Sequence, residues 1–90
     1  MLFMVIERFR KRDAEPIYRR FRDRGRLMPE GLHYRASWVE KNLDSCFQLM
    51  ECDDERLFQD WMANWNDLMD FEIVPVTTSD EMQKMMFPRV

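Results

Sequence analysis

Four ionisable side chains are spaced so that they could share one surface and take part in acid–base chemistry. In this chain of 90 residues, side chains alternate along the expected strands. This alternation sets on one face of the expected sheet Glu7, His33, Arg35 and Glu51. A carboxylate in a half-apolar pocket has a raised pKa and can act as a base, while a neighbouring polar group polarises a substrate oxygen. We therefore predict a ligand-binding site with Glu7 or Glu51 as the base and His33 or Arg35 as the polarising group. The alternative is an ion-pair cluster that only sets the pairing of the strands.

Other motifs that carry chemistry are absent from the sequence. Cys46 and Cys52 lie six residues apart in one expected strand, so their α-carbons would be about 20 Å apart, beyond the roughly 7 Å reach of a disulfide. No second thiol or histidine stands at zinc-ligand spacing, and His33 alone is a weak candidate for haem or metal. There is no phosphate-binding loop and no GxSxG nucleophile motif. We expect reduced cysteines, no metal site and no cofactor.

The elements that must position these residues follow from the changing hydrophobic period. A period of two predicts strands, and a period of 3.6 predicts helices. Strands are expected at Leu2–Phe9, Gly31–Glu40, Ser45–Cys52 and Phe71–Thr77, and helices at Ala14–Arg24 and Asp54–Trp65. This order is the β-α-β-β-α-β plan of the ferredoxin-like α+β fold. We predict one domain over residues 1–90, with a four-stranded antiparallel sheet of order 4-1-3-2 and two helices on one face.

A further short helix is expected at the end of the chain, over about residues 79–87. Ser79-Asp80-Glu81 is typical of a capped helix start. The apolar stripe that follows is too large to leave in water and consists of Met82, Met85, Met86 and Phe87. We expect this helix to dock on a sheet edge or on a partner chain.

The pairing of the central hairpin decides which side chains meet on the helix-free face of the sheet. We expect that face to carry Glu7, Glu51, Glu72, His33 and Arg35 on an apolar floor of Phe3, Val5, Phe47, Leu49 and Val74. A three-residue loop, Asn42–Asp44, sets Arg35 opposite Glu51, and we prefer this register. A four-residue loop starting at Lys41 flips one strand, so that the candidate ligand-binding residues become Tyr34, Trp38 and Glu51.

Composition and charge limit the classes of partner and the cellular location that we expect. No apolar run approaches the roughly 18 residues of a membrane-spanning helix, and the first residues lack a signal peptide's basic segment and cleavage site. We therefore expect a cytoplasmic protein without a membrane partner. Residues 1–35 carry ten Arg or Lys against five acids, and residues 36–90 carry four against twelve, which favours mutual neutralisation of two solvated faces. The strand Ser45–Cys52 has one aromatic and no basic residue, unlike an RNA-recognition motif, so no nucleic-acid partner is expected.

Several segments together resemble a family of small, mostly bacterial proteins known only as a domain of unknown function. They are Met1-Leu2-Phe3-Met4-Val5, Pro29-Glu30-Gly31-Leu32, Ser37-Trp38, Phe47-Gln48-Leu49-Met50-Glu51, and Trp65-x-Asp67-Leu68-x-Asp70-Phe71-Glu72 followed by Val74-Pro75-Val76. The resemblance implies a place among the dimeric α+β barrels, in which two ferredoxin-like sheets face each other. That group includes cofactor-independent monooxygenases, haem-degrading enzymes, lactone isomerases and stress-response proteins, so the fold alone does not select an activity.

The helix-free face predicts the assembly. It carries five or six large apolar side chains, roughly 500–600 Å², near the upper limit for an exposed patch on a monomer. We predict a homodimer whose sheets meet face to face and enclose a pocket for a small organic ligand. The expected function is that of a small-molecule-binding or stress-associated dimer. The alternative is a small cofactor-independent monooxygenase or isomerase that uses an inner-face carboxylate.

Overall fold

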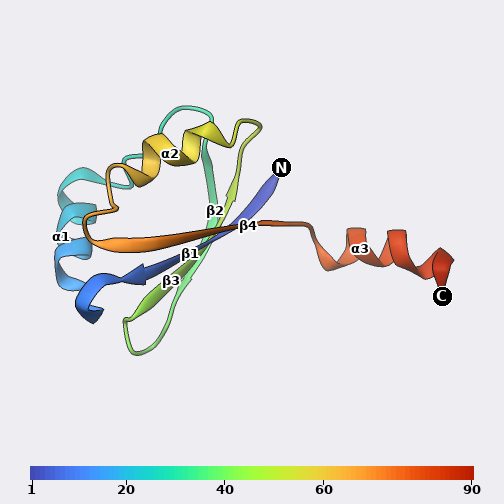
Figure 1. Ribbon diagram of the computed structural model, residues 1–90, viewed down its shortest axis with the longest axis horizontal. Helices are drawn as coiled ribbons and strands as arrows, with labels where there is room; N and C mark the ends of the chain where they lie inside the picture. Colours follow the sequence, from blue (N-terminus) through green and yellow to red (C-terminus); the bar gives the residue numbers. More distant parts are fainter.

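The computed structural model describes residues 1–90 and contains four strands and three α-helices (Figure 1). The strands are β1 (Leu2–Phe9), β2 (His33–Val39), β3 (Ser45–Glu51) and β4 (Met69–Val76). The helices are α1 (Glu15–Arg24), α2 (Arg56–Met62) and α3 (Ser79–Met86), with short 3₁₀ turns at Arg10–Arg12 and Phe87–Arg89. The strands form one antiparallel sheet of order β2-β3-β1-β4. This is the predicted order read from the opposite edge, and it confirms the ferredoxin-like α+β fold.

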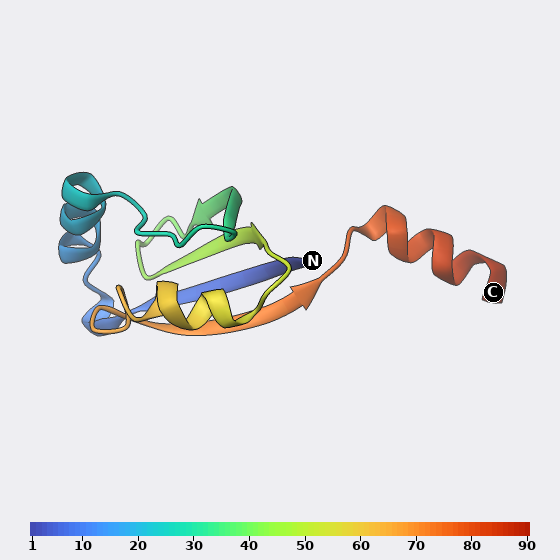
Figure 2. The ribbon, with the colours of Figure 1, turned by 90° about the horizontal axis from the view of Figure 1, so that it is seen from above.

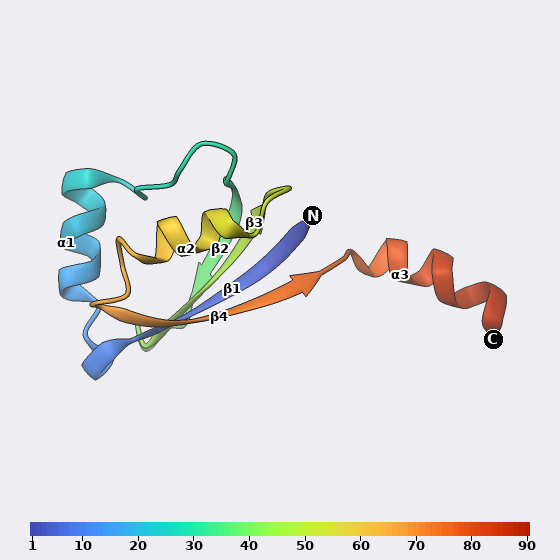
Figure 3. The ribbon, with the colours of Figure 1, turned by 45° about the horizontal axis from the view of Figure 1, so that its top comes forward.

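Local sequence explains where the first two helices begin and end. Asp13 accepts a hydrogen bond from the Glu15 backbone N–H at 3.1 Å at the start of α1, and Gly25, at φ +72°, ends that helix. Asp54 accepts from the Arg56 N–H at 3.0 Å at the start of α2. Helix α2 is shorter than the expected Asp54–Trp65, because turns replace the regular helix after Met62. Figures 2 and 3 show α2 beside the sheet and α1 near the end where β1 finishes and β4 begins.

The core lies between the helices and one face of the sheet. Its largest buried side chains include Phe3 from β1, Met50 from β3, and Phe58 and Trp61 from α2. The rings of Phe3 and Phe58 meet edge to face, with centroids 5.1 Å apart. None of the helices combines the length and apolarity needed to cross a bilayer.

The expected orientation of β1 is wrong. Phe3, Val5 and Glu7 were assigned to the helix-free face, but they are buried on the helix side, with 1%, 0% and 4% of their surface exposed. Directly paired residues point to the same side of a sheet, and Val5 pairs with the buried Gln48. The helix-free side of β1 instead carries Leu2, Met4 and Ile6. The residues on both sides of β1 are mostly apolar, so alternation alone does not show which side faces the helices.

The helix-free side of β3 and β4 agrees with expectation. Phe47, Leu49 and Glu51 alternate with the buried residues of β3. On β4, Glu72 pairs with Ile6 and Val74 pairs with Met4. We call this surface the open face, and its apolar residues are Leu2, Met4, Ile6, Ala36, Trp38, Phe47, Leu49, Val74 and Val76.

A β-bulge combines features of the two hairpin registers. Near the turn, Trp38 pairs with Phe47 and the Glu40 N–H donates to the Ser45 carbonyl at 3.0 Å, so the loop spans residues 41–44. The preferred three-residue loop is therefore wrong. Between Tyr34 and Ala36 the pairing shifts by one residue, because a bulge adds one residue to β2. The shift leaves Arg35 able to reach Glu51 while Trp38 shares the open face with Phe47.

Helix α3 projects from the end of β4, away from the rest of the molecule, in all three views (Figures 1, 2 and 3). Thr78 caps it by accepting a hydrogen bond from the Glu81 N–H at 3.1 Å. Its apolar stripe is exposed, including Met85 at 57% and Phe87 at 64%. The docking on an edge of the chain's own sheet is therefore not found, because the link at residues 77–78 leads the chain away from the sheet before the helix begins.

Candidate functional site

A cavity of about 210 Å³ lies on the helix side of the sheet, and we call it the Glu7 cavity. Nine of its 13 lining residues are hydrophobic, which is typical of a small-molecule site. Its aromatic wall comes from Phe9, Tyr18, Phe21, Trp61 and Trp65, and its four polar residues are Glu7, Arg26, Ser37 and Gln48. Tyr18 and Phe21 are 46% and 40% exposed, so the cavity is bordered by solvent along α1.

Glu7 is the buried acid of this cavity. It lies on β1 opposite Cys46 of β3 and Phe71 of β4. Burial raises the pKa of Glu7, and the side chains of Gln48 and Cys46 and the charge of Arg26 offset only part of this effect. Its carboxyl group therefore holds a proton to higher pH than an exposed glutamate does.

Cys46 is a buried thiol beside this carboxyl group. Burial and the negative charge of Glu7 raise the pKa of Cys46 to about 12. A thiol with that pKa stays protonated at neutral pH and is a poor nucleophile. Cys46 therefore contributes an apolar surface with a weak hydrogen-bond donor to the cavity.

Arg26 closes part of the cavity with a cation held between aromatic rings. Its guanidinium carbon lies 3.7 Å from the centre of the Tyr34 ring and 4.8 Å from that of Phe21, within the range of cation–π contacts. Its backbone carbonyl accepts two hydrogen bonds, from the indole N–H of Trp61 at 3.1 Å and of Trp65 at 3.0 Å. The two indoles thus anchor the segment that follows α1.

Two polar atoms of the cavity residues are buried without a hydrogen-bond partner. They are Oε1 of Gln48, an acceptor, and Nε of Arg26, a donor. A buried polar atom left unpaired costs about 1–3 kcal/mol, and native proteins keep few of them. Both atoms belong to residues that line the same cavity, but they have almost no accessible surface and so do not face its open space.

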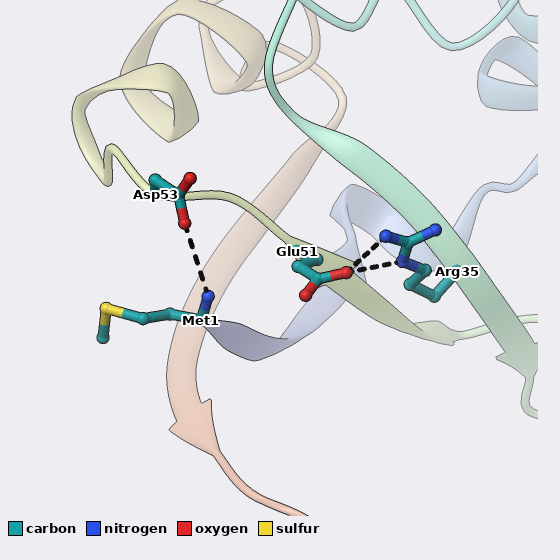
Figure 4. A network of polar contacts seen from close by, with 4 residues as sticks. All are labelled: Met1, Arg35, Glu51 and Asp53. Atoms are coloured by element: carbon teal, nitrogen blue, oxygen red, sulfur yellow. Dashed lines mark hydrogen bonds and ion pairs between the residues drawn. The ribbon is translucent and has the colours of Figure 1, made fainter.

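A second polar cluster lies on the open face (Figure 4). The guanidinium of Arg35 donates to Oε1 of Glu51 through Nε at 2.8 Å and also through a terminal nitrogen. Both side chains are partly exposed, at 51% and 38%, and the Arg35 hydrogen bonds lower the pKa of Glu51. The N-terminal ammonium of Met1 lies 3.9 Å from Oδ1 of Asp53 nearby. These are surface ion pairs, and none of their residues lines the Glu7 cavity.

A family model described as "Domain of unknown function (DUF3303)" matches residues 1–90, the whole chain. The chain belongs to the DUF3303 family. No curated protein matches this DUF3303 chain, so its site must be interpreted from its own residues.

In this DUF3303 chain the predicted site residues divide between the two sides of the sheet. His33 pairs with Glu51 in the ladder, and Arg35 contacts Glu51. Glu7 lies on the opposite side of the sheet, in the cavity. Of the residues expected from the flipped register, Trp38 is on the open face with Glu51. Tyr34 pairs with the buried Met50 and stacks on Arg26 at the helix side.

The DUF3303 cavity depends on residues that the sequence did not single out. Gln48 carries a signal that could have found it, because it is the one polar residue on the inward side of β3, between Cys46 and Met50. Arg26 carries none, because its position between two rings depends on how α1 packs. No group of three or more His, Cys, Asp and Glu side chains is placed to hold a metal ion.

Proposed function

We propose that this protein binds a small organic molecule in the Glu7 cavity. The observation that carries the proposal is the cavity itself, in which the buried acid Glu7 lies among nine hydrophobic lining residues. An apolar pocket with a few polar groups that fix orientation is typical of ligand sites. The ligand lies between the sheet and the helices of one chain, and not between two facing sheets as the sequence suggested.

Acid–base catalysis is the second candidate function, as in a cofactor-independent isomerase or monooxygenase. It is favoured by Glu7, the buried carboxyl group in the cavity, because burial raises its pKa toward the range useful for proton transfer. In this alternative Glu7 takes a proton from the bound substrate. Glu51 is not the base, since its pKa is lowered by Arg35 and it is not among the cavity residues.

We further propose that the protein works as a homodimer that covers its open face. Trp38 on that face is 56% exposed, and the apolar residues around it are only half-buried. Helix α3 has eight residues, too short to be stable alone in water, so its exposed stripe also needs a surface. The apolar stripe of α3 and the open face together present roughly 800 Å² of apolar side-chain surface. This is the area that each partner of a standard protein interface buries. A second copy, which offers the same two surfaces, covers both in a closed two-fold arrangement.

Tryptophan fluorescence tests ligand binding in the cavity. Trp61 and Trp65 line the cavity, whereas Trp38 lies on the other side of the sheet, so a Trp38→Phe background reports the cavity alone. Titration with small aromatic compounds should change the fluorescence saturably. Ser37→Phe places a ring in the cavity and should weaken binding about tenfold or more. Ser45→Phe is the matched control, because Ser45 pairs with Arg8 on the open face, and it should bind normally. Equal binding by both variants would exclude the cavity as the site.

A further inference from the structure

The open face carries an apolar strip that runs diagonally across the sheet, between ion pairs at two opposite corners. At one corner, where β4 begins, Arg8 donates to Glu72 at 3.2 Å. At the opposite corner, where β3 ends, Arg35 donates to Glu51. The cross-strand neighbours between these corners form the apolar strip, which consists of Val76, Val74, Met4, Leu49, Phe47 and Trp38.

The apolar strip has the dimensions of one helix. It crosses the three gaps between neighbouring strands, about 14 Å, and four residue steps along them, about 13 Å, so it is about 19 Å long. Helix α3 has eight residues, and with the three residues of the 3₁₀ turn that follows it is about 18 Å long. A helix with its side chains is about 10–12 Å wide, which leaves the two corners of the face uncovered.

The charges of the two surfaces favour a helix over a second sheet as the occupant of the strip. On α3 the charged side chains lie off the apolar stripe, and Lys84 pairs with Glu81 at 3.6 Å. A helix on the strip leaves both ion pairs of the open face at its border, in water. A second sheet laid flat on the same face would bury them, and taking ion pairs out of water is costly.

The helix α3 of the same chain points away from this strip. Only Thr77 and Thr78 separate it from β4, and Thr78 is extended, at φ −71° and ψ 152°, while its hydroxyl caps the helix. The helix therefore continues outward in all three views (Figures 1, 2 and 3). A projecting arm of this kind can cover the strip of a second copy, and two-fold symmetry makes the exchange reciprocal.

We infer that α3 of each copy packs along the apolar strip of its partner's open face. This inference rests on the homodimer of the proposed function and names the surfaces that form it. The stripe of α3 contacts the strip, and Trp38, at 56% the most exposed of the three tryptophans, lies beneath the helix. Thr77 and Thr78 form the crossover between the two copies.

Paramagnetic broadening between two differently labelled copies tests this exchange. Full-length ¹⁵N-labelled protein is mixed with an excess of unlabelled full-length protein that carries a nitroxide at Gln83→Cys, on the polar side of α3. Cys46 and Cys52 are buried, so the nitroxide attaches at the substituted position. The Trp38 indole signal of the labelled copy should be lost, and it should return when ascorbate reduces the nitroxide. The signals of Trp61 and Trp65, on the other side of the sheet, should lose less intensity.

A nitroxide at Arg24→Cys is the matched control, because Arg24 is exposed on α1 at the helix side of the sheet, and it should leave the Trp38 signal in place. Loss of that signal only when nitroxide and isotope share one chain would mean that α3 docks on its own chain, which overturns the exchange. A dimer mass by light scattering without loss of the signal in either sample also overturns the exchange, and the proposed homodimer then stands. A monomer mass would exclude the homodimer and the exchange together.

Discussion

Glu7 and Gln48 lie on the same side of the neighbouring strands β1 and β3, two residues apart in the ladder, and both border the cavity. The ladder pairs Val5 with Gln48 and Glu7 with Cys46, so the two polar side chains are diagonal neighbours within an otherwise apolar surface. Both are more than nine-tenths buried. A folded chain keeps such a costly pair where it serves a site, and the cavity beside it supplies that site.

Replacement of Glu7 by Gln should stabilise the protein at neutral pH and abolish part of its pH dependence. Burial raises the pKa of Glu7 in the folded state, so with rising pH the unfolded chain releases this proton first. The contribution of Glu7 to stability therefore falls from its ordinary carboxyl pKa up to its folded-state pKa. We expect Glu7→Gln to raise the free energy of unfolding at neutral pH by about 1–3 kcal/mol, and with it the unfolding temperature. The gain should be lost in acid, where Glu7 is protonated in both the folded and the unfolded state.

Thermal unfolding at a series of pH values measures this gain. Glu30→Gln is the control, because Glu30 is exposed. A gain of the same size at acidic and neutral pH would mean that the buried charge is not its cause.

The Arg35–Glu51 pair should show coupling in a double-mutant cycle. The two side chains share hydrogen bonds on the open face, so reversing both charges together should be tolerated better than either reversal alone. The hydrogen bonds lower the pKa of Glu51. Their stabilising effect is therefore present above the ordinary carboxyl pKa and lost as the pH falls through the lowered value. Denaturant unfolding of the four proteins gives the cycle, and additive effects would show that the contact is absent in solution.

Helix α3 should be required for the dimer. Two variants test this. The double substitution Met85→Lys with Met86→Lys places two charges in the exposed apolar stripe, and removal of residues 77–90 deletes the helix. Light scattering coupled to size exclusion at micromolar concentration should give a dimer mass for the native chain and a shift toward monomer for both variants. Gln83→Lys with Lys84→Ala is the control, because neither residue belongs to the apolar stripe. A monomer mass for the native chain would exclude the dimer.

The order of strands and helices could be predicted from the sequence because most elements keep one hydrophobic period along their length. Which side of β1 faces the helices could not be predicted, because Leu2, Met4 and Ile6 are as apolar as Phe3 and Val5. Grouping the charged residues on one side set Glu7 on the helix-free face, and this grouping fails because Glu7 is buried on the helix side, in a cavity.

The same reasoning explains what the sequence revealed of the candidate site. The contact of Arg35 with Glu51 was expected from a three-residue hairpin loop, but it arises from a four-residue loop and a bulge that has no glycine to mark it. The role of Arg26 depends on two indole hydrogen bonds from residues more than 30 positions away. Such long-range contacts leave no local pattern in the sequence.

The most direct test of the ligand site is the two-dimensional ¹H–¹⁵N spectrum of the native protein during titration with the small aromatic compound that changes its tryptophan fluorescence most. The three tryptophan indole N–H groups give separate signals, which single Trp→Phe variants assign. Trp61 and Trp65 line the cavity and donate to the Arg26 carbonyl, whereas Trp38 is on the open face. The account predicts saturable shifts of the Trp61 and Trp65 signals with little change for Trp38. Shifts confined to Trp38, or none at saturating ligand, would contradict it.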